Sequence, residues 1–235
     1  MKKNLKANSM KKLPYLLLLI SLSVQSQNIL FVGNSLTYTN DMPKMLEQIG
    51  KQNDLKIKTT SLCYPNYAII DHINEGKLQK LLQKKQFDYV IIQQGPSSQE
   101  EGKRMLVNDG ATIKALCEQY NIQLGYFMVW PSKHYYNTFD KVIANHEFAA
   151  KQNNALLFPV GKIWKQYNEH ESNTSSLYSS DNFHPSTAGS FLAALTIFHQ
   201  LHPTKNIEQL PFKKYQKWVA DKGSFDFLVQ LVQKQ

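Results

Sequence analysis

From residue 28 onward, the chain alternates short apolar runs with amphipathic stretches. Runs rich in β-branched and aromatic residues predict strands, and apolar positions spaced three or four residues apart predict helices between them. The predicted strands cover residues 28–32, 56–62, 87–92, 123–129 and 155–160. The predicted helices cover residues 42–52, 78–82, 101–120, 138–152 and 186–199, followed by one or two helices within 211–235.

The order of these elements predicts the fold. Strands that alternate with helices along a whole chain are typical of a parallel sheet with helices on both faces. Five strands joined by right-handed crossovers indicate an α/β protein, a three-layer α/β/α sandwich with a flavodoxin-like, five-stranded parallel sheet. The run 87–92 is apolar almost throughout, as expected for a central strand buried on both faces. No repeat or linker divides the sequence, so we predict a single domain over residues 27–235, including the C-terminal helices.

Residues 1–26 have the pattern of an export signal. Five lysines precede an apolar block at 13–22, and the small and polar residues 23–26 follow it. This order of a basic region, an apolar region and a small-residue exit predicts a signal peptide, and therefore a periplasmic or extracellular protein. The apolar block is too short for a stable membrane-spanning helix, so no stable membrane insertion is expected after cleavage. A permanent N-terminal anchor is the alternative.

Charge and cysteine content narrow the class of protein. The formal net charge of +9 includes five lysines of the predicted signal, which contains no acidic residue. Arg104 is the single arginine, whereas nucleic-acid contacts favour arginine, so no nucleic-acid partner is expected. Cys63 and Cys117 are too few for a disulfide framework and have no metal-ligand neighbours at a recognisable spacing. We expect two separate, mostly buried thiols and neither a metal nor an organic cofactor.

Polar residues follow several of the predicted strands. Ser35 comes directly after the first strand, Asn66 lies in the loop after the second, and Gln94 comes after the third. The carboxyl ends of parallel strands meet at one edge of the sheet, where ligands bind in open α/β folds. The segment 181–184 follows the last strand and can reach the same edge. We therefore expect these residues to converge on one site.

Ser35, His184 and Asp181 fit the chemistry of a serine nucleophile. A serine hydroxyl needs an imidazole to take its proton, and the imidazole needs a carboxylate to hold its tautomer. Asp181 and His184 are three residues apart in a loop closed by Pro185, a spacing at which the carboxylate can reach the ring. The alternative is structural: Ser35 and Asp181 would cap helices, and His184 would be an unrelated surface residue.

The two ends of the chain together resemble the SGNH/GDSL hydrolase family. Residues 33–36, Gly-Asn-Ser-Leu, are similar to that family's Gly-Asp-Ser-Leu block, and residues 181–185, Asp-Asn-Phe-His-Pro, are similar to its final Asp-x-x-His-Pro block. The resemblance covers nearly the whole chain after residue 26. It implies an esterase-type acyl transfer in which Ser35 is the nucleophile and Asp181 and His184 complete a triad.

The middle of the chain departs from the family pattern, where the family places its oxyanion-hole donors. The family's second block has a glycine that offers a backbone N–H, and its third block has an asparagine side chain. Here the corresponding loops contain Asn66 and residues 94–97, Gln-Gly-Pro-Ser, which look like the Gln-Gly-Glu-Ser stretch of carbohydrate esterases in this superfamily. The implied donors are the backbone N–H groups of Ser35 and Asn66 and the side chain of Gln94, with Ser97 as the alternative to Gln94.

Two further residues are predicted to line the substrate pocket. Trp130 follows the fourth strand, where an aromatic ring can stack on a sugar or an acyl chain. His72 follows the second polar loop, where related sequences often carry a histidine, and we expect a pocket-wall or helix-capping role rather than catalysis. The remaining histidines have no shared spacing that predicts a metal site.

These features predict an exported serine hydrolase that cleaves a carboxylic ester through an acyl-enzyme on Ser35. The implied substrate is a small-molecule or glycan ester, in particular an acetyl group on a carbohydrate. Two alternatives stay open: a glycan O-acetyltransferase on the same fold, and a catalytically weak glycan-binding protein with altered oxyanion loops. The sequence predicts no particular oligomeric state.

Overall fold

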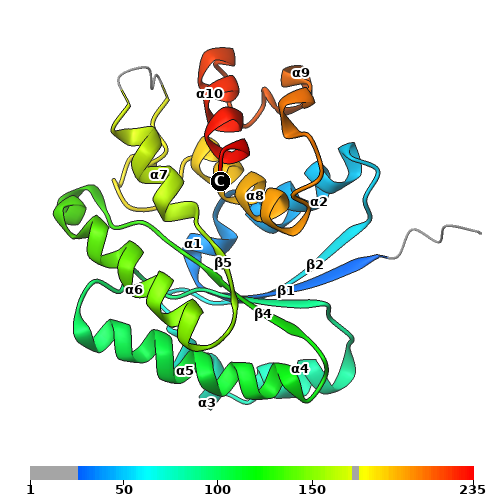
Figure 1. Cartoon of the computed structure of the whole chain (residues 1–235), viewed down its shortest axis with the longest axis vertical. Helices are drawn as coiled ribbons and strands as arrows, with labels where there is room; N and C mark the ends of the chain where they lie inside the picture. Colours follow the sequence, from blue (N-terminus) through cyan, green and yellow to red (C-terminus); the bar gives the residue numbers. More distant parts are fainter. Residues whose placement is uncertain (1–25, 171–174) are drawn as a thin grey trace, which may run out of the picture.

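The fold is built on one five-stranded parallel sheet (Figure 1). The computed structural model describes residues 26–170 and 175–235, so residues 1–25 of the predicted signal peptide lie outside the described residues. The strands pair in the order β2-β1-β3-β4-β5, and all four pairings are parallel. Their bounds are β1 Gln27–Gly33, β2 Ile57–Cys63, β3 Tyr89–Ile92, β4 Gln123–Phe127 and β5 Leu156–Phe158.

Helices cover both faces of this sheet, which confirms the predicted three-layer α/β/α architecture (Figure 1). One face carries α2 (Met42–Gln52), α7 (Val160–Asn168), α8 (Thr187–Leu201) and α10 (Lys222–Gln233). The other carries α3 (Ile69–Asn74), α4 (Lys77–Lys84) and α5 (Glu100–Glu118), with α6 (Phe139–Gln152) packed between α5 and α7. Shorter helical turns are α1 (Ser35–Tyr38), η1 (Thr39–Asp41), η2 (Lys133–Thr138), η3 (Ile207–Gln209) and α9 (Phe212–Tyr215).

Strand β1 divides the core into two parts because its side chains alternate between the faces. Ile29 and Phe31 pack in the cluster formed with α2 and α8, whereas Leu30 and Val32 pack in the cluster formed with α3 to α5. All four side chains are fully buried. A strand buried on both faces needs an apolar residue at every position, which explains the unbroken apolar run in the sequence. Strand β3 is the central strand, as its apolar run predicts.

The small residues of α8 bring this helix close to its neighbours. A Cβ atom placed on Gly189 would lie 2.3 Å from the Leu177 carbonyl oxygen and 2.6 Å from the Trp164 ring, so a larger side chain would force the helix outward. The Ser186 hydroxyl caps α8 by accepting a hydrogen bond from the Gly189 N–H at 3.2 Å. This cap fixes the start of α8 directly after the segment 181–185.

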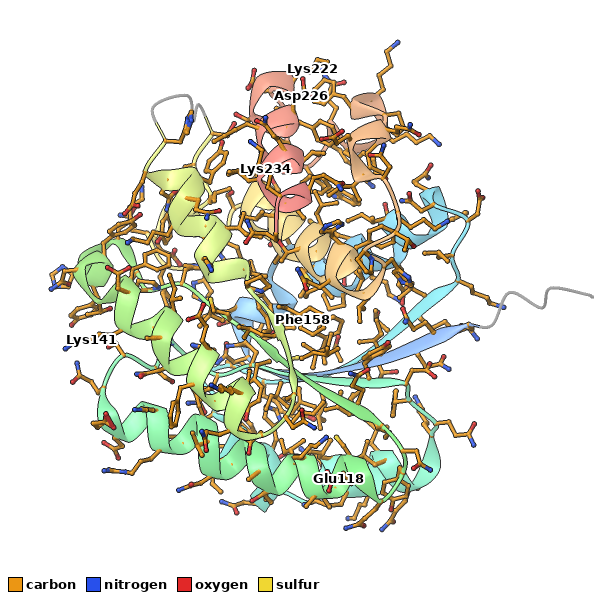
Figure 2. All side chains as sticks on the ribbon, in the orientation of Figure 1. Glu118, Lys141, Phe158, Lys222, Asp226 and Lys234 are labelled. Atoms are coloured by element: carbon orange, nitrogen blue, oxygen red, sulfur yellow. The ribbon has the colours of Figure 1, made fainter. Side chains whose placement is uncertain are left out.

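The C-terminal helices pack on α8 through aromatic side chains. The ring centroids of Tyr215 and Phe225 lie 5.5 and 5.7 Å from the ring centroid of Phe191 on α8. The C-terminal helices therefore belong to the same core as α8. Figure 2 shows the contrast between this interior and the surface: Phe158 lies at the centre of the molecule, whereas Lys141 and Lys222 lie at its periphery. No helix within 26–170 and 175–235 is both long enough and apolar enough to cross a bilayer.

Two helices were not predicted from the sequence. Helix α7 begins at Val160, where we predicted the end of the last strand, and the buried residues Ile163, Trp164 and Tyr167 follow with helical spacing. Helix α3 has only six residues and directly follows a turn-rich loop, so its periodicity is too short to recognise. Both helices connect a strand end to the next element and therefore help to shape the carboxyl edge of the sheet.

The buried histidine of α6 makes the stability of this fold sensitive to acid. His146 is 1% exposed, its Nδ1 atom lies 2.8 Å from the Val142 carbonyl oxygen, and burial lowers its pKa to about 4. The unfolded chain would bind a proton near pH 6.5 that the native state takes up only near pH 4. We therefore expect the free energy of unfolding to fall as the pH drops through this interval, with His146 contributing about 3 kcal/mol.

Urea unfolding at a series of pH values measures this effect. The variant His146→Leu should show a shallower decrease in stability between pH 6.5 and 4 than the native protein. A smaller decrease should remain because burial also lowers the pKa values of His72, His199 and His202. Identical slopes for the two proteins would contradict the assignment to His146.

Candidate active site

Ser35 lies at the carboxyl end of β1, as the sequence predicts. Strand β1 ends at Gly33, and Ser35 begins the short helix α1. Asn34 caps this helix: its Oδ1 atom accepts a hydrogen bond from the Leu36 N–H at 3.1 Å. The Asn34 Nδ2 atom donates to the Tyr67 carbonyl oxygen at 2.9 Å, so the same residue ties the loop after β2 to the turn that carries Ser35.

Ser35, His184 and Asp181 form one continuous hydrogen-bonded chain. The Ser35 hydroxyl lies 2.9 Å from Nε2 of His184, and Nδ1 of His184 lies 2.6 Å from Oδ2 of Asp181. A carboxylate accepts, so Nδ1 carries the proton and Nε2 is free to accept from the serine. This is the tautomer in which an imidazole can act as a base toward a hydroxyl group.

The Asp181 carboxylate is held in place by its own loop. Its Oδ1 atom accepts hydrogen bonds from the Ser179 hydroxyl at 2.7 Å and from the backbone N–H groups of Phe183 and His184, both at 2.9 Å. The hydrogen bonds from Ser179, His184 and Phe183 hold the pKa of Asp181 well below its usual range. The carboxylate is therefore ionised across the neutral range and can stabilise a positively charged imidazole.

A further side chain, Asn40, links the two halves of this arrangement. Its Nδ2 atom donates to the Pro185 carbonyl oxygen and to the Ser190 hydroxyl, both at 3.0 Å. Ser190 in turn donates to the Thr39 carbonyl oxygen at 3.2 Å. Asn40 has a left-handed backbone conformation (φ 56°), which asparagine tolerates better than most residues. The segment that follows Ser35 is thus bonded directly to the loop that carries His184.

Trp130 is not a pocket wall, contrary to the prediction. It is fully buried, and its ring stacks on Trp164 with centroids 3.6 Å apart. Its Nε1 atom donates to the Phe183 carbonyl oxygen at 3.0 Å, so it supports the loop of the triad from inside the core. The strand ends before Trp130, and the sequence could not show which way the ring turns.

His72 was predicted to line the substrate pocket, but it is buried, with 1% of its surface exposed. Its Nε2 atom lies 2.9 Å from the Gly33 carbonyl oxygen, and because a carbonyl only accepts, Nε2 carries the proton. The ring lies against Tyr64 and Tyr67, at centroid distances of 5.9 and 5.1 Å. Burial lowers the pKa of His72, which favours a neutral ring. Through its bond to the Gly33 carbonyl oxygen, this ring supports the turn that carries Ser35.

The side chains of Gln94 and Ser97, one of which is predicted to donate to an oxyanion, bind their own loop. Gln94 Nε2 donates to the Ser97 hydroxyl at 2.8 Å and lies 3.5 Å from the Gly102 carbonyl oxygen. The Ser97 hydroxyl donates to the Gly95 carbonyl oxygen at 3.0 Å. Gln94 and Ser97 are 3% and 5% exposed. Both side chains therefore stabilise the loop after β3.

Asn66 keeps a geometry that suits a backbone donor. It has a left-handed backbone conformation (φ 63°), and its side chain is exposed. Within residues 26–170 and 175–235 its N–H has no hydrogen-bond partner, and its neighbour Tyr67 accepts the bond from Asn34. The Asn66 N–H stays a predicted oxyanion donor together with that of Ser35.

Gln93, which the sequence analysis did not single out, binds the serine turn directly. Its Oε1 atom accepts hydrogen bonds from the Asn34 N–H at 2.9 Å and from the Thr37 hydroxyl at 2.8 Å. A Cβ atom on Gly33 would lie 2.6 Å from this oxygen, so the glycine makes room for it. The two consecutive glutamines after β3 indicate a polar loop at the carboxyl edge of the sheet, but the sequence does not show which of them faces the serine.

Neither a metal cluster nor a disulfide is found in the described parts of the chain. No three His, Cys, Asp or Glu side chains within 26–170 and 175–235 are placed to hold a metal ion. Cys63 is half-buried and Cys117 is buried, and both thiols are free. Burial raises the pKa of each thiol to about 12, so neither is an activated nucleophile.

Comparison with solved structures identifies the fold. A DUF4886 family protein from Bacteroides uniformis matches with a TM-score of 0.75 at 14% identity, over 89% of this chain and 94% of that protein. A candidate SGNH hydrolase from Slackia heliotrinireducens matches with a TM-score of 0.61 at 24% identity, over 75% and 100%. An acetyl-xylooligosaccharide esterase from a Geobacillus species matches with a TM-score of 0.58 at 14% identity, over 75% and 94%.

At these identities the likeness establishes the fold. No protein-family model and no curated protein sequence matches the chain. The sheet order, the helical layers and the solved structures together confirm the fold class that the order of strands and helices predicts.

Proposed function

We propose that this chain, which has the fold of the SGNH hydrolases, is an exported serine esterase, and specifically a carbohydrate O-acetylesterase. The observation that carries the esterase assignment is the hydrogen-bonded chain from Ser35 through His184 to Asp181, at 2.9 and 2.6 Å. Export rests on the N-terminal sequence pattern. The acetyl-glycan part rests on the Gln-Gly-Pro-Ser stretch at 94–97 and on the names of two structural neighbours, an acetyl xylan esterase and the acetyl-xylooligosaccharide esterase.

The proposed reaction has two steps. The Ser35 oxygen attacks the ester carbonyl carbon while His184 Nε2 takes the hydroxyl proton, and the carbonyl oxygen becomes negatively charged. Collapse of this intermediate breaks the bond to the alcohol, which leaves with the proton from His184, and the acyl group stays on Ser35. A water molecule then gives a proton to His184 and attacks the acyl carbon. The bond between this carbon and the Ser35 oxygen breaks, His184 returns the proton to that oxygen, and the acid leaves.

The protein stabilises charge at two points of this reaction. Asp181 stabilises the imidazolium that forms each time His184 holds the extra proton. The backbone N–H groups of Ser35 and Asn66 stabilise the negative oxygen, and each such donor contributes about 3 kcal/mol. The proposed hole rests on these backbone groups.

Labelling with a fluorophosphonate probe tests the nucleophile assignment. The native protein should be labelled on Ser35, and an acetylated oligosaccharide should release acetate without transfer to a second sugar. Labelling at another residue would contradict the assignment. Acetate that appears on an added glycan acceptor instead of in solution would favour the transferase alternative.

Removal of the Gln93 oxygen should impair the reaction through the serine turn. The variant Gln93→Leu leaves the Asn34 N–H and the Thr37 hydroxyl without their acceptor, so Ser35 loses its fixed position. We expect a fall in kcat of about tenfold to hundredfold with little change in KM, as for other displaced catalytic groups. Steady-state kinetics with p-nitrophenyl acetate, together with the rate of fluorophosphonate labelling, measures this effect.

The variant Thr37→Val is the matched control. It removes one of the two hydrogen bonds to Gln93 and keeps the bond from the Asn34 backbone, so its effect should be smaller. If Gln93→Leu is labelled as fast as the native protein, then Gln93 does not position Ser35.

A further inference from the structure

An open cleft of about 580 Å³ adjoins the loop that carries Asp181 and His184. Its walls come from three segments: the loop after β3, the η2 turn after β4, and the loop of the triad itself. The cleft is lined by Pro96, Ser98, Gln99, Tyr135, Thr138, Asp181 and Phe183, among others. The volume lies within the range of small-molecule binding sites.

The position of this cleft matches the alcohol half of an ester. In the proposed reaction His184 Nε2 protonates the leaving oxygen, so the alcohol must lie beside the imidazole. Asp181 lines the cleft, and the Phe183 ring lies 5.1 Å from the His184 ring. The proposed oxyanion donors come from the loops after β1 and β2, whereas the cleft lies by the loops after β3 and β4. Because β2 and β3 flank β1, the loop of Asn66 and the cleft lie on opposite sides of Ser35.

The lining of the cleft suits a sugar ring. Tyr135 is 61% exposed and is the most exposed of the large hydrophobic side chains in the described part of the chain. Pro96 and Phe183 add flat apolar surface, and Ser98, Gln99 and Thr138 add hydrogen-bonding groups. A sugar has an apolar C–H face that stacks on an aromatic ring and hydroxyl groups that need polar partners, so this mixture fits both parts.

Charge narrows the class of sugar. Asp181 is the one charged residue among the side chains that line the cleft in the described structure, and it is ionised at neutral pH. A carboxylated or sulfated glycan would meet this negative charge without a compensating cation. An uncharged sugar meets no such repulsion.

The Tyr135 segment is bonded to the loop of the triad. The Lys133 N–H donates to the Asn182 carbonyl oxygen at 2.9 Å, and the Tyr135 N–H donates to the Ser132 carbonyl oxygen at 3.0 Å. The Thr138 hydroxyl donates to the Tyr135 carbonyl oxygen at 2.8 Å. The exposed ring is thus carried by a segment with a fixed position relative to His184.

We propose that this cleft is the subsite for an uncharged sugar that carries the ester, with Tyr135 stacked on the sugar ring. The proposal rests on the proposed esterase function. It adds the chemical class of the alcohol and the place in the site where this alcohol binds. The variant Tyr135→Ala should lower kcat/KM for peracetylated xylose about tenfold and leave kcat/KM for ethyl acetate within about twofold, because ethanol is too small to reach the ring. Tyr135→Phe keeps the stacking surface and should retain activity on the sugar ester.

Tyr120→Ala is the matched control. Tyr120 is also exposed, at 39%, but it lies at the opposite edge of the sheet, just before β4 begins. It should change neither activity. Equal losses on both esters in Tyr135→Ala, or no loss on the sugar ester, would overturn the subsite. A loss confined to a decanoate ester would assign the cleft to the acyl chain and would overturn it as well.

Binding of xylotriose, measured by calorimetry, separates this proposal from the esterase proposal. Xylotriose has no ester, so its affinity reports the subsite alone, and Tyr135→Ala should weaken it about tenfold. An unchanged affinity, or no binding by the native protein, would overturn the subsite. Tyr135-dependent binding without Ser35-dependent hydrolysis would support the subsite and overturn the esterase assignment.

Discussion

Replacement of Ser35 by alanine should lower kcat for p-nitrophenyl acetate by about four to six orders of magnitude, as for other serine nucleophiles that act with a base. The hydroxyl is the atom that would bond to the acyl carbon, and neither cysteine thiol is activated to replace it, since burial raises the pKa of both. Ser35 is partly exposed at the start of α1, so its loss should leave the fold intact. Steady-state kinetics of highly purified protein measures the effect.

Ser61→Ala provides the control for this experiment. Ser61 is an exposed serine on β2, the edge strand, and the pairing register places it beside Phe31 rather than at the carboxyl end of the sheet. This variant should keep full activity. If Ser35→Ala retains activity within tenfold of the native protein, Ser35 is not the nucleophile.

Replacement of Asp181 by asparagine should lower kcat by about three to four orders of magnitude. The asparagine oxygen can keep hydrogen bonds from the Phe183 and His184 N–H groups, so the loop should hold its shape. The amide cannot stabilise an imidazolium as a carboxylate does, and an N–H directed at Nδ1 selects the wrong tautomer of His184. The low pKa of Asp181 keeps the native carboxylate ionised from neutral to mildly acidic pH, so protonation of Asp181 should not limit kcat in that range.

The pH profile of kcat and a matched variant test this role. Asp54→Asn changes an aspartate in a left-handed conformation (φ 58°), which asparagine also accepts, and Asp54 lies just before β2, at the edge of the sheet away from Ser35. It should not affect kcat. A loss of less than tenfold in Asp181→Asn, with unchanged thermal stability, would show that Asp181 does not orient His184.

The sequence was sufficient to predict the sheet and the two segments that carry the triad, the turn of Ser35 and the loop 181–185. Buried strands must be apolar on both faces, and turn residues at the strand ends mark the carboxyl edge, so the positions of Ser35 and of the loop 181–185 followed from patterning alone. These features depend on local periodicity and on topology, which one sequence expresses directly.

The interior of the site could not be predicted in the same way. After a strand ends, the alternation of side chains stops, and nothing in the sequence tells whether Gln93 or Gln94 turns toward the serine. Trp130 and His72 have polar atoms that are consistent with a pocket wall, yet both use these atoms on backbone carbonyl groups inside the protein. Side-chain direction at such positions is set by packing between distant segments.

The bond between Ser35 and His184 joins residues 149 positions apart in the chain, and Asn40 reinforces it through Pro185 and Ser190. Contacts of such long sequence separation form only after a large loss of chain entropy, and topologies rich in them fold slowly. The site is therefore absent from any folding intermediate in which the C-terminal third, with α8, has not yet docked on the sheet. During synthesis the serine turn emerges early and stays without its base until nearly the whole chain has been made.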